Sequence, residues 1–202
     1  MKKFLKVLLI LFFTSSLYSQ STLEEYFYAG VAKYKFKDHY GAIADYTKAI
    51  ELDTSYTNAY HNRGLAKNKL KDYYGAIADY SKAIELDPNY TYAYNNRGLA
   101  KNKLKDYYGA IADYTKAIEL DPNYTNAYNN RGLAKDKLKD YYNAISDYNK
   151  VIELDPNYTY AYNNRGVSKW HLKDNIGACS DFRKAAYMGL KIAQNNVRDY
   201  CE

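Results

Sequence analysis

Residues 91–124 read TYAYNNRGLAKNKLKDYYGAIADYTKAIELDPNY, and these 34 residues form one complete copy of an internal repeat. The stretch before it, residues 57–90, is equally long and differs at three positions. Residues 125–158 continue in the same register, and residues 23–56 and 159–192 are more divergent copies. Self-similarity at a fixed period of this length indicates a repeat architecture in which each unit stacks on its neighbours.

Each copy is predicted to form two helices joined by a short turn. In the fourth copy we expect the first helix to run from about Ala127 to Leu138. The second helix is expected to begin after Asp140, because an aspartate at the N-cap accepts hydrogen bonds from free N–H groups. Its apolar residues recur at helical spacing, and the Asp-Pro pair that closes several copies stops the helix. The N-caps at the same place in other copies would be Asp72, Asp106 and Asp174.

A spaced set of residues in each copy resembles the tetratricopeptide repeat (TPR) family. In the third copy the set is Tyr94, Gly98, Ala110, Tyr114, Ala117 and Pro122. The resemblance implies that the small residues let paired helices approach closely, while the tyrosines fill the space between pairs. It also implies an all-α fold, a right-handed α-solenoid of five helix-turn-helix units with a C-terminal capping helix over residues 193–202. Residues 185–189, AAYMG, resemble the related Sel1-like variant, which suits a terminal unit.

Arginines stand where the TPR family often has a large apolar residue. Each of them precedes an aspartate by sixteen residues, so we predict an ion pair that links the two helices of a copy. A partly buried pair of this kind favours helix register more than raw stability. The four predicted pairs are Arg63–Asp79, Arg97–Asp113, Arg131–Asp147 and Arg165–Asp181.

Residues 1–19 are predicted to be a signal peptide. A basic start, Met1-Lys2-Lys3, precedes an almost wholly apolar run from Phe4 to Phe13, and a polar stretch leads to cleavage after Ser19. The apolar run is much shorter than the roughly 20 residues that span a bilayer. We therefore expect an exported protein, periplasmic or secreted, with no stable membrane span after cleavage. A retained N-terminal anchor is the alternative interpretation.

The charge of the chain gives no indication of nucleic-acid binding. The whole sequence has 29 basic and 23 acidic residues, but three of the lysines lie in the leader. The mature chain would have a net charge of only +3, which is too balanced for the basic surface that nucleic acid requires.

Two cysteines, Cys179 and Cys201, lie near the C-terminus. An even number of cysteines in an exported protein indicates a disulfide, which here would tie down the final helix. The alternative is that both are unpaired small residues of the core.

The sequence offers no catalytic site. The three histidines are far apart and have no metal-ligand spacing, and neither a glycine-rich phosphate loop nor a nucleophile elbow is present. We expect no enzyme activity, no cofactor and no bound metal.

The TPR resemblance implies that the first helices line a concave groove. Asparagines recur there, and an amide offers both a donor and an acceptor, so a row of amides could hold an extended peptide by its backbone. The aromatic residues would take side chains. The predicted groove residues are Asn62, Asn95, Asn96, Asn129, Asn130, Asn163, Asn164, Tyr92, Tyr160, Trp170, Lys103 and Lys137. The alternative is that the asparagines are a solvated face copied with the repeats.

These observations favour an exported, monomeric scaffold that binds another protein or an extended peptide segment. Two other functions stay open from the sequence. The repeats could assemble end to end as a structural component of the cell envelope, or the tyrosines and asparagines could bind glycans.

Overall fold

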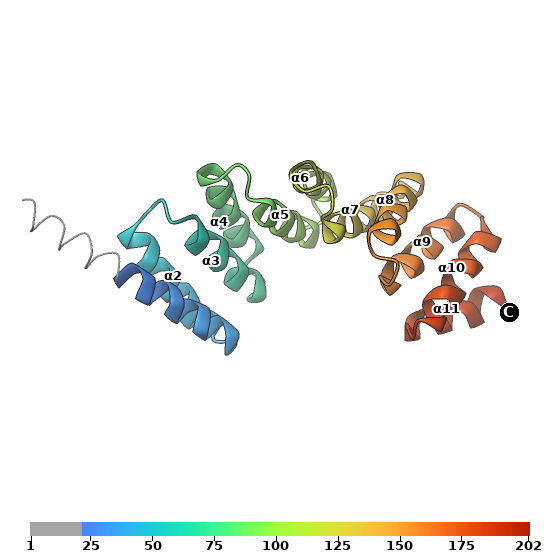
Figure 1. The fold of residues 1–202 in the computed structure, drawn as a ribbon, viewed down its shortest axis with the longest axis horizontal. Helices are drawn as coiled ribbons and strands as arrows, with labels where there is room; N and C mark the ends of the chain where they lie inside the picture. The colour runs from blue at the N-terminus through green and yellow to red at the C-terminus, as the bar shows by residue number, and fades with distance from the viewer. Residues whose placement is uncertain (1–21) are drawn as a thin grey trace, which may run out of the picture. The chain divides into compact units, whose positions relative to one another are not determined.

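The computed structural model describes residues 22–202, and this part of the chain is all-helical without a strand (Figure 1). The predicted signal peptide, residues 1–19, lies outside the described residues. The helices follow one another as antiparallel pairs, which confirms the predicted fold class. After a helix over residues 22–35 they are α2 (His39–Leu52), α3 (Thr57–Lys69), α4 (Tyr73–Leu86), α5 (Thr91–Lys103), α6 (Tyr107–Leu120), α7 (Thr125–Lys137), α8 (Tyr141–Leu154), α9 (Thr159–His171), α10 (Asn175–Tyr187) and α11 (Lys191–Cys201).

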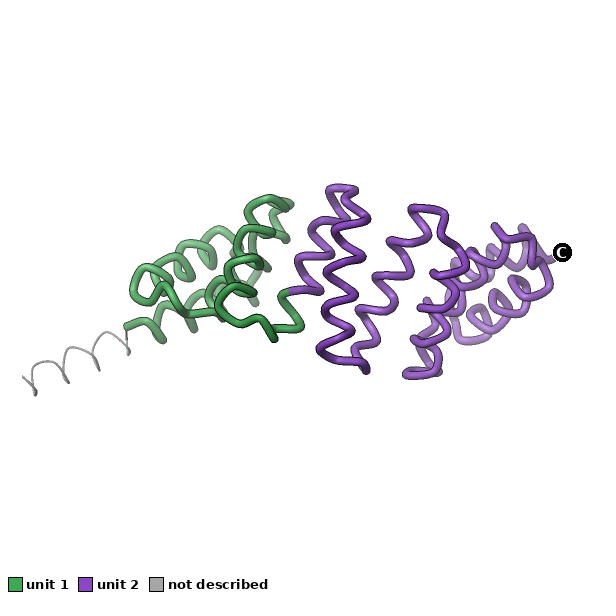
Figure 2. The backbone as a smooth tube through the Cα atoms, turned by 90° about the horizontal axis from the view of Figure 1, so that it is seen from above, with its two compact units in different colours: residues 1–93 green, residues 94–202 purple. Residues whose placement is uncertain are grey.

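The chain divides into two compact units, which Figure 2 shows in different colours. Unit 1 ends at Ala93, and unit 2 runs from Tyr94 to Glu202. In unit 1 α3 packs between α2 and α4. In unit 2 the helices from α6 to α11 pack each on the next along the chain, and α7 also contacts α9. Each unit is therefore a stack of helix pairs.

The core of each repeat is an aromatic ring set against a glycine. Tyr114 of α6 is fully buried, and a Cβ added to Gly98 of α5 would lie 2.7 Å from its ring. Tyr148 meets Gly132 in the same way. The paired helices can approach this closely only because the glycine has no side chain. This agrees with the prediction that small residues at this position allow close packing of the two helices.

The predicted arginine–aspartate pairs are present in all four repeats. The Nε of Arg97 donates to Oδ2 of Asp113 at 3.0 Å, and its NH2 donates to Oδ1 at 2.7 Å. Lys101, one helical turn after the arginine, adds a second ion pair at 2.8 Å. The role of this lysine was not predicted from the sequence, and it recurs at the same place as Lys67, Lys135 and Lys169.

The predicted helix caps hold, with one exception. Asp72, Asp106 and Asp174 each accept a hydrogen bond from the backbone N–H of the glycine three residues later. Asp140 occupies the N-cap of α8 as predicted, but its side chain does not accept the expected capping hydrogen bond. The residue three places on is Asn143, which donates to both carboxylate oxygens of Asp140 at 2.9 Å. In the other repeats a Cβ at this glycine would lie 2.1–2.2 Å from Oδ2 of the capping aspartate, so a larger residue displaces the carboxylate from its capping position.

The turn between the helices of each repeat contains a lysine in the left-handed region. These five lysines have φ between 61° and 65°, a conformation that usually favours glycine. The backbone N–H of the following aspartate closes the turn, as between Asp106 and the carbonyl of Lys101 at 2.9 Å. The lysines are Lys37, Lys71, Lys105, Lys139 and Lys173.

Cys179 and Cys201 form a disulfide, which joins α10 to α11. The predicted bridge is therefore present, and the alternative of two unpaired core cysteines is excluded. The last helix begins at Lys191, two residues before the predicted capping segment. Within residues 22–202 no helix combines the length and apolar character that a bilayer crossing requires. The Sel1-like character of residues 185–189 stays a prediction.

Candidate functional site

The structure contradicts part of the predicted groove. Asn95, Asn129 and Asn163 are only 4%, 7% and 6% exposed, so their side chains do not form an open row for a peptide. Sequence spacing placed them on the first helices but could not fix which way each helix is rotated against its neighbours. These three asparagines are therefore not part of an open binding surface.

The buried asparagines join consecutive repeats of unit 2. Asn130 donates from Nδ2 to Oδ1 of Asn95 at 3.1 Å, and Asn164 donates likewise to Asn129 at 3.5 Å. The series ends in the last helix, where Asn196 donates to Asn163 at 2.9 Å. The amides therefore satisfy one another across the repeat boundaries, as buried polar groups require.

His61 occupies the corresponding buried position in unit 1. Its ring lies 5.7 Å from the ring of Tyr80, and its Nδ1 lies 3.2 Å from the hydroxyl of Tyr90. Burial lowers the pKa of His61 to about 4, although a hydrogen bond with Asn62 acts in the opposite direction. A neutral imidazole thus stands where the third, fourth and fifth repeats have an amide.

The other predicted residues differ in exposure. Trp170 is half-buried, because its ring packs 4.8 Å from that of Tyr200 on α11, so one side of the indole is covered. Tyr92 in unit 1 and Tyr160 in unit 2 are both 59% exposed. Lys103 and Lys137 are exposed at the ends of α5 and α7, while the remaining asparagines are half-buried. These are Asn62, Asn96, Asn130 and Asn164.

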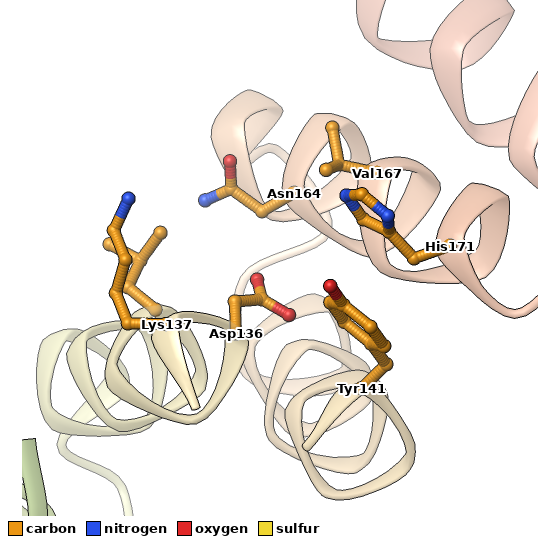
Figure 3. A pocket seen from close by; sticks show the side chains of 7 residues that line it. Asp136, Lys137, Tyr141, Asn164, Val167 and His171 are labelled. Carbon is orange, nitrogen blue, oxygen red and sulfur yellow. The ribbon is translucent and has the colours of Figure 1, made fainter. Parts of the chain in front are cut away.

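A cavity of about 230 Å³ lies in unit 2 between α7, the start of α8 and α9 (Figure 3). It brings together two of the predicted residues, Lys137 and Asn164. We call this cavity the α7–α9 pocket, and the residues that line it are Leu133, Asp136, Lys137, Tyr141, Asn164, Val167 and His171.

Asp136 is a half-buried charged group in the wall of the α7–α9 pocket. Its Oδ2 accepts a hydrogen bond from the Tyr148 hydroxyl, and its Oδ1 accepts one from Ser168 Oγ, both at 2.7 Å. Burial raises the pKa of Asp136, whereas these two bonds and the nearby charges of His171 and Lys137 act to lower it. The two hydroxyls hold the carboxylate in one orientation at the wall of the cavity.

This arrangement exists in one repeat because two positions changed together. The residues at the place of Asp136 in the two preceding repeats are Asn68 and Asn102, and Ser168 stands where they have alanine. The hydroxyls of Tyr80 and Tyr114, which match Tyr148, are buried and have no hydrogen-bond partner within residues 22–202. The sequence showed both substitutions, but their contact spans 32 residues and depends on how two repeats stack.

An aromatic pair closes another side of the pocket. The ring of His171 stacks on that of Tyr141 with a centroid distance of 4.6 Å and an interplanar angle of 9°. Tyr141 is half-buried and His171 is exposed, so the stack presents its outer surface toward solvent. Leu133 and Val167 add an apolar surface next to it. The pocket thus combines a fixed carboxylate with flat aromatic and apolar walls.

The described residues contain no cluster of three or more histidine, cysteine, aspartate or glutamate side chains that could hold a metal ion. The lining of the α7–α9 pocket offers a carboxylate, an amide and apolar groups for contact with a ligand.

Comparison with known proteins agrees with the fold. A family model of the tetratricopeptide repeat matches residues 57–90, 91–124 and 125–158, which make up just over half of the chain. No curated protein matches the chain significantly.

Solved structures of TPR proteins are similar to this chain. One is MamA, at 27% identity over 87% of this chain and 96% of its own, with a TM-score of 0.78. The TPR domain of Arabidopsis OM64 is 31% identical over 61% of this chain and 98% of its own, with a TM-score of 0.56. YrrB, a TPR protein with an unusual peptide-binding site, is 23% identical over 90% and 97% of the two chains, with a TM-score of 0.76, and this likeness concerns the fold alone.

The repeated 34-residue unit, the stacked helix pairs and the three matched segments lead to one conclusion: the chain belongs to the tetratricopeptide repeat family.

Proposed function

We propose that the chain is an exported scaffold whose unit 2 binds an extended segment of a partner protein across the first-helix surface around the α7–α9 pocket. The observation that carries this proposal is the pocket itself, because its lining comes from consecutive repeats and includes polar and apolar groups. Concave sites that bind specific ligands typically combine apolar walls with a few well-placed polar groups.

Half-buried amides beside the pocket support binding of a peptide backbone. Asn130 and Asn164 each donate one hydrogen bond to an amide of the preceding repeat. A side-chain amide has two N–H donors and an oxygen that accepts, and each of these bonds uses one donor. The bonds also fix the orientation of both amides, so a peptide would meet groups that are already ordered.

The disulfide supports export. Bridges between cysteines persist in oxidising compartments and are rare in reducing ones. Cys179 and Cys201 are bridged, and the predicted signal peptide points to the same compartment. Binding of peptides by another protein of this fold, YrrB, supports the choice of a peptide as the ligand class.

The test is a selection of displayed random peptides on the purified chain, followed by measurement of their affinities. Replacing Asn130 and Asn164 together by alanine is expected to lower the affinity for the selected peptides at least tenfold. The matched control is Asn126→Ala, an exposed asparagine on the same helix α7, which is expected to change affinity less than twofold. Circular dichroism must show unchanged helix content in both variants.

Two results would contradict the proposal. One is a selection that recovers no peptide, and the other is unchanged affinity in the folded double variant. Light scattering across a concentration series gives an independent check, since a monomeric binding module keeps a constant mass while an assembly component grows.

A further inference from the structure

We propose that the α7–α9 pocket recognises a cationic side chain of the bound segment, specifically the guanidinium of an arginine. The inference deepens the proposed peptide-binding function and rests on it for its biological role. Its physical basis is the difference between the partners of the half-buried Asp136 and those of the buried aspartates in the second to fifth repeats.

The buried aspartates of the second to fifth repeats, by contrast, already have two cations each. Asp147, for example, accepts hydrogen bonds from Arg131 and Lys135 at distances down to 2.7 Å. Asp79, Asp113 and Asp181 have the same arginine and lysine partners. A carboxylate with these partners has its charge compensated within the protein.

Asp136 is held instead by neutral hydroxyl groups. Ser168 and Tyr148 orient the carboxylate, and no ion pair within 4 Å involves Asp136 in the described part of the chain. A buried carboxylate without a cation is costly, and an incoming cation would recover part of that cost. A carboxylate can accept about four hydrogen bonds, so capacity remains after the two hydroxyl donors.

The shape and walls of the pocket suit a flat cation. A cavity of about 230 Å³ is smaller than the roughly 300–1,000 Å³ typical of small-molecule sites, which favours a single side chain as occupant. The parallel stack of Tyr141 and His171 offers a planar aromatic wall on which a guanidinium can lie. Leu133 and Val167 would contact the apolar stem of the arginine.

Lys137 and His171 are the basic groups that face the same pocket. They would favour an acidic ligand, which is the alternative to a cation. Figure 3 shows the Asp136 side chain directed toward Tyr141 and His171, while the nitrogen of Lys137 extends away from it along the opposite side. Lys137 is exposed, so water screens its charge, whereas Asp136 is half-buried and acts at close range. An acidic ligand would have to approach this fixed carboxylate, and the observations therefore favour a cation.

The test uses three small probes on the full chain, observed by NMR titration. The first is Nα-acetyl-arginine methylamide, the second its neutral isostere Nα-acetyl-citrulline methylamide, and the third Nα-acetyl-glutamate methylamide. The arginine probe is expected to shift the signals of Asp136, Tyr141 and His171. The citrulline probe is expected to bind at least tenfold more weakly.

Matched variants test the role of the carboxylate. Asp136→Asn introduces the residue that the preceding repeats have at this place, Asn68 and Asn102, so folding is expected to persist. This variant is expected to lower the affinity for the arginine probe at least tenfold. The control variant, Asp199→Asn on α11, is expected to change that affinity less than twofold. Lys137→Gln is expected to strengthen binding two- to fivefold, because it removes a like charge.

The results separate this inference from the proposed function. Selected peptides that bind without dependence on arginine or on Asp136 would overturn the pocket inference and leave the peptide-binding proposal intact. If the arginine probe binds through Asp136 but the chain selects no peptide, the peptide-binding proposal is overturned and the pocket inference stands. Preference for the glutamate probe, or equal binding of arginine and citrulline, would overturn the cationic assignment.

Discussion

The surroundings of Tyr114 and Tyr148 differ although the repeats that contain them are nearly the same. Both rings are fully buried and both lie against a glycine of the preceding helix. The Tyr114 hydroxyl has no hydrogen-bond partner in the described part of the chain, whereas the Tyr148 hydroxyl donates to Asp136. The comparison shows that copied repeats keep their packing while one or two changed positions give a buried site new chemistry.

The largest effect on stability is expected at His61 in unit 1, at the position where the later repeats have asparagine. Because its pKa falls from an ordinary 6.5 to about 4 on folding, the unfolded chain binds the proton more tightly. Stability is therefore complete above about pH 6.5 and is lost as the pH falls toward 4, by about 3 kcal/mol at about 1.4 kcal/mol per pKa unit.

His61→Asn is the matched variant for this loss. Urea unfolding between pH 7 and 4, followed by circular dichroism, is expected to show the loss in the parent chain and not in the variant. An equal pH dependence in both chains would show that His61 does not cause it.

The next largest effect is expected from Asp136→Ala. The substitution leaves the buried Tyr148 hydroxyl without its acceptor, while the Ser168 hydroxyl keeps the Asn164 carbonyl at 3.1 Å. It should cost about 2 kcal/mol, since an unsatisfied buried group costs roughly 1–3 kcal/mol. Asn102→Ala, at the same place in the preceding repeat, is the control and should cost less than about 1 kcal/mol. Denaturant midpoints measure both, and equal losses would remove the distinction between the two sites.

A smaller effect separates the two tyrosines directly. Tyr148→Phe removes a hydrogen bond to a carboxylate and should destabilise the chain by about 1.5 kcal/mol, in the range for bonds to charged groups. Tyr114→Phe removes a buried hydroxyl without a partner and should be neutral or stabilising. The comparison fails if thermal unfolding shows the same shift for both variants.

The smallest effect is expected from building the Tyr148 site around Tyr114. Asn102→Asp and Ala134→Ser together place a carboxylate and a hydroxyl at the positions that correspond to Asp136 and Ser168. Their combined effect should exceed the sum of the single effects by about 1 kcal/mol, as residues within one hydrogen-bond network usually show. A double-mutant cycle that gives simple additivity would mean that other parts of the stack position Asp136.

The sequence predicts the repeat architecture well because the information is periodic. The 34-residue period, the small residue at Gly98 and the spacing from Arg97 to Asp113 each depend on geometry within a single repeat. The disulfide between Cys179 and Cys201 could be predicted because few cysteines were available to pair.

The candidate site was predicted less well, because it depends on contacts between repeats. Whether Asn95 or Asn96 faces a neighbour follows from a small rotation of the helix, which helical spacing does not determine. Asp136 was recognisable as a departure from Asn102, but its meaning required Ser168 from the next repeat. The capping hydrogen bond that Asp140 does not accept likewise depends on Asn143, whose effect is steric and local.

The bridge between α10 and α11 has a consequence for how the chain comes apart. In a stack held by nearest-neighbour contacts, the outermost helix has one neighbour and is the first to fray. Here the final residues of α11 remain attached to α10 even when their packing opens, so they return at high effective concentration. Local opening of α11 is therefore expected to be short-lived until the bridge is reduced.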